Sequence, residues 1–167
     1  MKAFGSLGDW KYKGTAKGNL YDEDGIDVTP GGSTLEIDND DEYVAGAQIT
    51  AGLSLDYKFG KGFRFDIGER YYGKNHGNLS SEGTAIDLPG YFLIDTGLSY
   101  KYKLKGSKSV NFRLNVNNLT DNFYISRSRD AKSADAPGAT LWHGVNTENR
   151  VRTGYGRTWN ASVRFKF

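Results

Sequence analysis

The stretch Trp159-Asn160-Ala161-Ser162-Val163-Arg164-Phe165-Lys166-Phe167 closes the sequence and guides the interpretation of everything before it. Its odd positions are apolar or small, and its even positions are polar. Strict period-two alternation predicts an extended strand with one apolar face and one polar face. The apolar face must then be covered either by a protein core or by lipid.

The same alternation recurs along the chain and predicts about six long strands. Before the closing segment, we expect strands at 10–20, 47–59, 63–68, 92–103 and 110–117. Strands of globular proteins have a mode near 5–6 residues, whereas a tilted strand needs about 9–11 to cross a bilayer. No stretch approaches the ~18 consecutive apolar residues of a transmembrane helix. These features favour an all-β, antiparallel transmembrane β-barrel segment.

The composition agrees with a β protein rich in turns and aromatic rings, with 22 Gly, 11 Tyr, 9 Phe and no Cys. The mean hydropathy of −0.62 does not oppose a barrel, because the polar face and the loops dilute the apolar face. The net charge of +2 is small and the basic residues are dispersed, which gives no indication of nucleic-acid binding.

The predicted connections alternate in length, and this sets an orientation. Residues 60–62 and 105–107 form short, glycine-containing turns. The other connections are long: residues 22–44, 74–90 and 127–154. In outer-membrane barrels the short turns are periplasmic, which puts Phe167 at the periplasmic rim. Aromatic residues near the short turns are Trp10, Tyr12, Tyr57, Phe59, Phe63, Tyr100, Tyr102, Phe165 and Phe167, and those near the long connections are Tyr21, Tyr71, Tyr72, Tyr91, Phe92, Tyr155 and Trp159.

Two motifs resemble a known family. Residues 115–124, N-V-N-N-L-T-D-N-F-Y, are similar to the penultimate-strand segment N-x-x-N-L-[F/T]-D-x-x-Y of TonB-dependent outer-membrane receptors. Residues 154–167 resemble the closing G-R-[T/S]-[W/F]-x-[A/G]-S-[L/V]-x-[F/Y]-x-F of that family, in a style closest to receptors of the Bacteroidetes group. The motif positions are Asn115, Asn118, Leu119, Asp121, Tyr124, Gly156, Arg157 and Trp159.

The resemblance implies a larger molecule. Such receptors have a barrel of about 22 strands around a plug, so residues 1–167 are expected to be the C-terminal portion of the barrel, without the plug, the earlier strands or a secretory signal. The implied function is the uptake of a scarce ligand, most often a ferric siderophore, with cobalamin or glycans as alternatives, and without enzymatic activity or a cofactor. The implied partners are the rest of the barrel and the plug, the TonB complex, the barrel-assembly machinery, and outer-membrane lipid with its lipopolysaccharide.

Two other functions fit the alternation alone. One is a different outer-membrane barrel, such as a porin-like channel, which would lack a plug domain upstream. The other is a soluble β-sandwich binding module such as an adhesin, which would stay in the aqueous fraction where a barrel segment needs detergent.

Two groups of residues are candidate functional sites. The end of the chain resembles the signal read by the barrel-assembly machinery, with Ser162 where glycine is expected; the matching positions are Asn160, Ser162, Phe165 and Phe167. The last long connection combines cations with aromatic residues, which suits an anionic chelate or lipopolysaccharide phosphates. Its candidate ligand-binding residues are Arg127, Arg129, Trp142, His143, Arg150 and Arg152.

Metal, haem and catalytic sites are not predicted. Residues 22–42 hold nine acids and no Lys or Arg, and Asp38, Asp40 and Glu42 alternate as oxygen ligands could. Tyr43 stands where a calcium loop would need glycine, so a solvated acidic loop is the preferred interpretation. We expect no haem at His76 or His143, and no nucleophile elbow, P-loop or zinc motif is present.

Glu69 does not fit the alternation, because it follows Phe63, Phe65 and Ile67 on the apolar parity. An acid on the lipid face of a barrel is unfavourable, although less so than Lys or Arg. We therefore expect a bulge at Gly68 that turns Glu69 inward.

Overall fold

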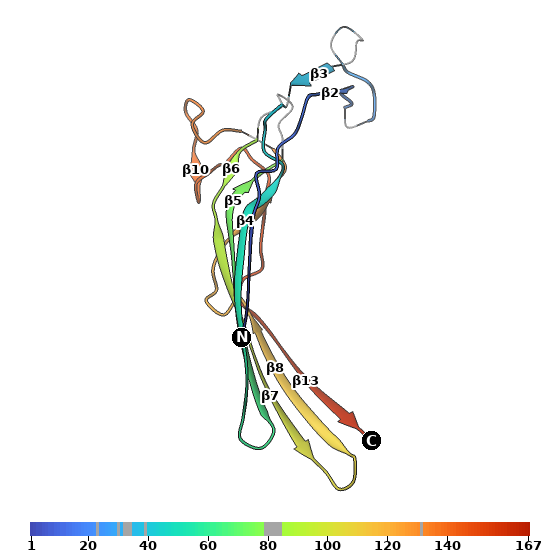
Figure 1. Ribbon diagram of the computed structural model, residues 1–167. Helices are drawn as coiled ribbons and strands as arrows, with labels where there is room; N and C mark the ends of the chain where they lie inside the picture. Colours follow the sequence, from blue (N-terminus) through green and yellow to red (C-terminus); the bar gives the residue numbers. More distant parts are fainter. Residues whose placement is uncertain (23, 30, 32–34, 39, 79–84, 131) are drawn as a thin grey trace.

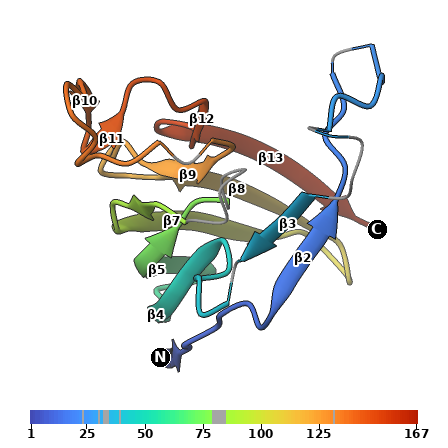
Figure 2. The same cartoon turned by 90° about the horizontal axis from the view of Figure 1, so that it is seen from above.

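A computed structural model describes residues 1–167 except 23, 30, 32–34, 39, 79–84 and 131. The main element is an open, curved antiparallel sheet in the order β1-β4-β5-β7-β8-β13, with the short β6 also paired to β5 (Figures 1 and 2). The strands of this sheet are β1 (Lys2–Leu7), β4 (Gly46–Phe59), β5 (Phe63–His76), β6 (Asp87–Leu88), β7 (Tyr91–Lys103), β8 (Ser109–Asn117) and β13 (Thr158–Lys166). The all-β, antiparallel prediction is confirmed.

Among the described residues, the long connections contain three small two-stranded ribbons. They are β2 (Thr15–Gly18) with β3 (Leu35–Asp38), β9 (Ile125–Ser128) with β12 (Val151–Thr153), and β10 (Leu141–Trp142) with β11 (Val145–Asn146). Figure 1 shows β2, β3 and β10 at one end of the sheet, called the outer end below, and the two short turns at the other. None of the described residues lies in a helix of the length and apolarity that crossing a membrane requires.

The sheet has one apolar and one polar face, as the alternation predicts. Residues that are direct partners on adjacent strands lie on the same face, so apolar residues form rows across the sheet. One such row is Tyr57–Phe65–Leu98–Leu114–Ala161. Most large apolar side chains of this face are exposed: Leu53, Leu55, Tyr57, Phe59, Phe63, Tyr71, Phe92, Leu98, Tyr102, Phe112, Leu114, Trp159, Val163 and Phe165. The one apolar core cluster found among the described residues lies instead in the outer connections, around Ile86, Leu88, Ile125 and Val145.

The two short turns fold as predicted. Gly60 and Gly62 both have positive φ, +53° and +104°, which lets β4 reverse directly into β5. The second turn is closed by the Leu104 N–H, which donates to the Lys108 carbonyl at 3.0 Å. These turns place Phe59 opposite Phe63, and so fix the register of the first hairpin.

The prediction of a long first strand at residues 10–20 is wrong. The strand beside β4 is β1, and in the predicted range only Thr15–Gly18 is a strand, β2, paired with β3 away from the main sheet. The alternation at 10–20 has small residues on its supposed apolar side, so it offers little apolar surface. Trp10 and Tyr12 consequently lie at the outer end of β4, where Trp10 N–H donates to Gln48 Oε1, and not near the short turns.

The predicted bulge at Gly68 is also absent. Around Gly68, the register of β5 with β4 is uninterrupted, because Gly68 pairs with Ser54 and Glu69 with Leu53. The register of β5 with β7 is uninterrupted there as well. Glu69 therefore remains on the apolar face, opposite Leu53 on one side and Ile94 on the other, and its side chain is exposed.

Both edges of the sheet are open. β1 pairs with β4 alone and β13 pairs with β8 alone, and in Figure 2 the two chain ends lie at opposite edges. The sheet is a barrel segment that does not close on itself.

Candidate functional site

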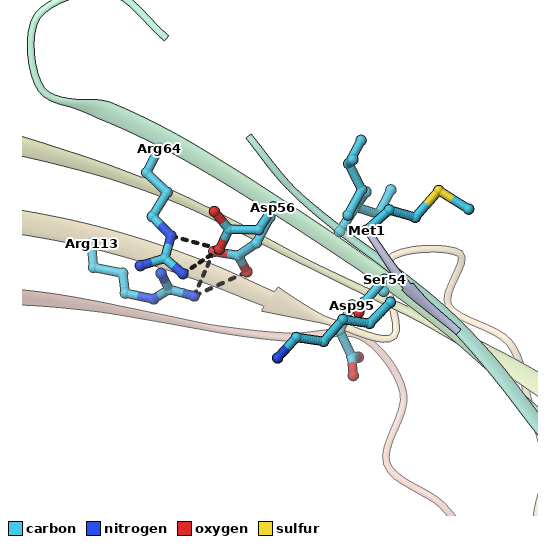
Figure 3. A pocket seen from close by; sticks show the side chains of 11 residues that line it. Met1, Ser54, Asp56, Arg64, Asp95 and Arg113 are labelled. Atoms are coloured by element: carbon cyan, nitrogen blue, oxygen red, sulfur yellow. Dashed lines mark hydrogen bonds and ion pairs between the residues drawn. The ribbon is translucent and has the colours of Figure 1, made fainter. Parts of the chain in front are cut away.

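The polar face carries a set of cross-strand ion pairs. Arg64 pairs with Asp56, Arg70 with Asp95, and Arg113 with Asp66 at 3.0 Å. All of these residues except Arg70 line a groove of about 650 Å³. Figure 3 shows Arg64 and Arg113 pointing into it beside Asp56, with the carboxylates of neighbouring strands within their reach. These three acids and three cations pair with one another. The same face also carries further cations, which give it a net positive charge: Lys58, Lys101, Lys103, Arg164 and Lys166.

Arg113 reaches Asp66 across an intervening strand. β7 lies between β5 and β8, and Gly97 is the β7 residue beneath the ion pair. A Cβ at Gly97 would lie 2.6 Å from Arg113 Nη2 and 2.7 Å from Asp66 Oδ2. The absence of a side chain at Gly97 thus makes room for the ion pair.

Three stacked tyrosines lie on the side of these ion pairs that is nearer to the outer end of the sheet. Sequence reasoning missed them as a group. The ring centroids of Tyr72 and Tyr91 are 4.8 Å apart, and those of Tyr91 and Tyr124 are 4.4 Å apart. Tyr72 and Tyr91 belong to the polar face, whereas their chain neighbours Tyr71 and Phe92 belong to the apolar one. The alternation of apolar and polar positions along β5 and β7 could have assigned Tyr72 and Tyr91 to one face and Tyr71 and Phe92 to the other.

Asn118 is the centre of a clasp, which we define as residues 118–124 and 154–157. Its side chain is 4 % exposed, and its φ of +50° turns the chain at the end of β8. The Nδ2 group donates to the carbonyls of Asn122 and Tyr155 at 2.9 and 3.2 Å, and Oδ1 accepts the Asn122 N–H at 2.9 Å. The Asn118 N–H donates to Asp95 Oδ1 at 2.9 Å, so the clasp is also tied to β7.

Asp121 ties the other half of the motif to the approach to β13. Its Oδ1 accepts the Arg157 N–H at 2.6 Å, and a Cβ at Gly156 would lie 2.9 Å from the same oxygen. Leu119 N–H donates to the Ile94 carbonyl at 2.7 Å, while the Leu119 carbonyl accepts Arg157 Nη1 at 3.4 Å.

The remaining motif positions line the same connection. The Tyr124 carbonyl accepts the Gly154 N–H at 2.9 Å, and its ring occupies the space that a Cβ of Gly154 would need. Asn115 donates through Nδ2 to Asn160 Oδ1 at 2.8 Å across β8 and β13. Trp159 stands on the apolar face and is 72 % exposed. Most of the motif therefore lies where β8 ends and β13 begins.

The structure separates three of the four candidate ligand-binding arginines into two groups. Arg150 is held by Asp130, which accepts its backbone N–H at 3.0 Å and its guanidinium at 2.9 and 3.1 Å. These bonds lower the pKa of the Asp130 carboxyl to about 2. Arg127 and Arg152 are instead direct partners across the β9–β12 ribbon, and both are exposed.

Trp142 and His143 belong to a separate aromatic cluster. With Phe123 they form three ring contacts, at centroid distances between 4.4 and 5.1 Å. His143 and Gly144 have φ values of +50° and +81°, and this tight turn between β10 and β11 presents the two rings. The predicted cation and aromatic residues are thus arranged as two distinct surfaces.

The candidate assembly residues lie along the open edge. Asn160, Ser162 and Phe165 belong to β13 and are exposed, and Phe167 follows it at 88 % exposure. Phe165 is on the apolar face opposite Val110, which is 8 % exposed.

In the acidic loop, several of the described acids bind within the chain. Asp40 Oδ1 accepts the Gly14 N–H at 2.8 Å, Asp41 pairs with Lys13 at 2.6 Å, and Glu42 Oε2 accepts the Ala85 N–H at 2.9 Å. Lys13 lowers the pKa of the Asp41 carboxyl. No group of three or more possible metal ligands occurs among the described residues.

His76 lies at the outer end of β5. Its ring stacks on Tyr43 at 4.2 Å between centroids, and Nδ1 lies 2.9 Å from Asp87 Oδ1. Both contacts join His76 to residues of the outer connections.

Comparison with known proteins identifies the family. Residues 4–119 match the family described as "TonB dependent receptor-like, beta-barrel". The chain belongs to the TonB-dependent receptor family. This is a family of outer-membrane receptors and not of enzymes. Membership confirms the resemblance and decides against the porin-like and β-sandwich alternatives.

Among the relatives of the TonB-dependent receptor chain are two proteins named "Ferrioxamine B receptor", from Salmonella typhimurium strains SL1344 and LT2. Each is 35% identical over 86 residues, which is 50% of this chain and 12% of the relative. The match therefore spans about an eighth of the length of these relatives. No solved structure matches the chain.

Proposed function

We propose that this chain is a wall segment of a TonB-dependent receptor that takes up a scarce ligand, in the first place a ferric siderophore. The observation that carries the proposal is the two-faced sheet, with an exposed apolar face and a polar face that carries cross-strand ion pairs. An apolar face of this size suits lipid, and a polar face suits a barrel interior.

The siderophore assignment rests on the relatives and on the outer connections. Both relatives are named for ferrioxamine B. The candidate contacts in this chain remain Arg127, Arg129, Trp142, His143, Arg150 and Arg152. Transport energy would reach the receptor through the plug and the TonB complex, which involve parts of the protein outside residues 1–167.

The open edges support a larger barrel. Unpaired N–H and C=O groups in hydrocarbon are unfavourable by several kcal/mol for each group. β1 and β13 would therefore pair with further strands, and a closed barrel of about 22 strands would result. By the same scheme the short turns are periplasmic, so Phe167 stands at the periplasmic rim.

Cysteine labelling of the complete receptor in outer membranes tests the faces. Single cysteines at Leu114 and Val163 are expected to react with a lipid-soluble maleimide, and cysteines at Asn115 and Arg164 with a water-soluble one. Leu114 and Asn115 are chain neighbours, and so are Val163 and Arg164. Within each of these pairs the two cysteines lie at the same depth in the membrane, and only the face of the sheet differs. Swapped reactivity would contradict the proposed orientation of the sheet.

The end of the chain is proposed as the assembly signal. An open strand edge with exposed terminal aromatics suits recognition by β-augmentation. Deleting Phe167 from the complete receptor is expected to lower its amount in the outer membrane several-fold, while ligand affinity of the inserted fraction stays unchanged. Deleting a loop residue such as Ala136 is the control. Equal surface abundance of the Phe167 deletion and the wild type would rule out this role.

A further inference from the structure

We propose that Arg127 and Arg152 form a binding site for a doubly charged oxyanion of the phosphate type. The site lies on the β9–β12 ribbon at the outer end of the sheet. The inference rests on the proposed function only in placing this ribbon outside the membrane.

The first observation is the register. Arg127 and Arg152 are direct partners in an antiparallel ribbon, with a register shift between Arg152 and Thr153 beside them. Direct partners project their side chains from the same face. Like charges directly opposite each other destabilise a strand pair. A ribbon of only a few residues has little stability to spare, and an anion between the two guanidinium groups would remove the repulsion.

The second observation is the lack of an internal counter-ion. Within 127–132 and 150–152 the sequence has five cationic residues and one acid, Asp130. That acid is already engaged by the backbone and guanidinium of Arg150, whose hydrogen bonds lower the pKa of the Asp130 carboxyl to about 2. Among the described residues, no carboxylate lies within ion-pair distance of Arg127 or Arg152.

The third observation is that the ribbon is anchored from behind. Ile125 and Ser128 are 2 % and 0 % exposed, and Val151 packs on the apolar cluster of the outer connections. The Ser126 hydroxyl donates to the Arg152 carbonyl at 3.0 Å. The backbone that carries the two arginines is therefore held in place while their side chains stay in solvent.

These observations select the ligand chemistry. Each guanidinium presents a planar fork of N–H donors, which matches two oxygens of a phosphate group. Two forks on neighbouring strands, with Cα atoms about 5 Å apart, can grip one tetrahedral dianion from both sides. Such a group could come from lipopolysaccharide or from a free phosphate-type anion.

The test uses the complete receptor purified in detergent, with two probes: lipid A carrying both phosphates, and inorganic pyrophosphate. Arg127→Ala/Arg152→Ala is expected to weaken lipid A binding by about tenfold or more. Lys132→Ala, which removes one cation from the same connection, is the matched control and is expected to change binding less than threefold. Arg127→Lys/Arg152→Lys keeps the charge but not the fork, and should recover only part of the affinity.

The second probe distinguishes the sources. If pyrophosphate competes with lipid A and its own binding falls in the double alanine variant, the site takes free oxyanions as well as the lipid headgroup. If pyrophosphate does not compete, the lipid headgroup is the source. Unchanged binding of both probes in the double alanine variant, or an equal loss in Lys132→Ala, overturns the proposal.

The outcome is separable from that of the proposed function. Unaltered thermal unfolding of the double variant shows that the fold is intact. Siderophore uptake can fail while oxyanion binding persists, and the reverse result is equally observable.

Discussion

Asn118→Ala is expected to lower the free energy of unfolding of the complete receptor by about 4–5 kcal/mol. The variant loses three hydrogen bonds of a buried side chain, each worth about 1–1.5 kcal/mol. It also leaves alanine at a φ of +50°, which adds about 1 kcal/mol of strain. The carbonyls of Asn122 and Tyr155 would lose their shared donor together.

Asn117→Ala is the matched control for this variant. Asn117 is the preceding residue, its side chain is exposed, and it makes one hydrogen bond, 3.2 Å from Nδ2 to Thr158 Oγ1. Its replacement is expected to change stability by less than about 1 kcal/mol. The midpoint of urea unfolding in lipid vesicles measures both variants. Equal midpoints for the two would mean that the clasp does not stabilise the end of the sheet.

Gly62→Ala is expected to destabilise the receptor by about 3–4 kcal/mol, against about 1 kcal/mol for Gly60→Ala in the same turn. At Gly62 a Cβ would overlap the Lys101 carbonyl oxygen, which is backbone of β7 and cannot rotate away. Its φ of +104° is also outside the region that alanine adopts readily. At Gly60 the nearest atom to a Cβ is Phe63 Cδ2 at 3.9 Å.

The difference between these two glycines reports on strand pairing. The Lys101 N–H donates to the Gly62 carbonyl at 2.8 Å, so the turn of the first hairpin is also paired to the next strand. Unfolding midpoints of the two variants, with Gly106→Ala in the open second turn as a further control, measure the effect. Similar losses at Gly60 and Gly62 would show that this contact with β7 is absent from the receptor.

Local patterns were sufficient to predict most of the sheet. Bulky apolar residues at alternate positions mark 47–59, 92–103, 110–117 and 159–167, and glycines mark the turn at 60–62, so each signal lies within its own segment. The pairing of β1 with β4 has no such signal, because residues 2–7 are short and residues 10–20 alternate as well. The continuous register at Glu69 is likewise set by the neighbouring strands and not by Gly68 alone.

The candidate sites were predictable only in part. The motif residues Asn118 and Asp121 could be selected by resemblance, but their acceptor or donor partners are fixed by three strands meeting at the outer end. Asp95 is such a partner, and nothing in its own segment distinguishes it from any other polar residue of β7. The opposition of Arg127 and Arg152 also depends on a register across a connection of more than twenty residues, which sequence alone does not supply.

The ion pair that passes over Gly97 has a mechanical consequence. Because Arg113 and Asp66 belong to strands separated by β7, sliding β5 or β8 relative to the other stretches this bond. A shift by one residue would also turn each charged side chain to the opposite face. The ion pair therefore opposes shear between β5 and β8, whereas β1 and β13 are each paired to the sheet on one side only.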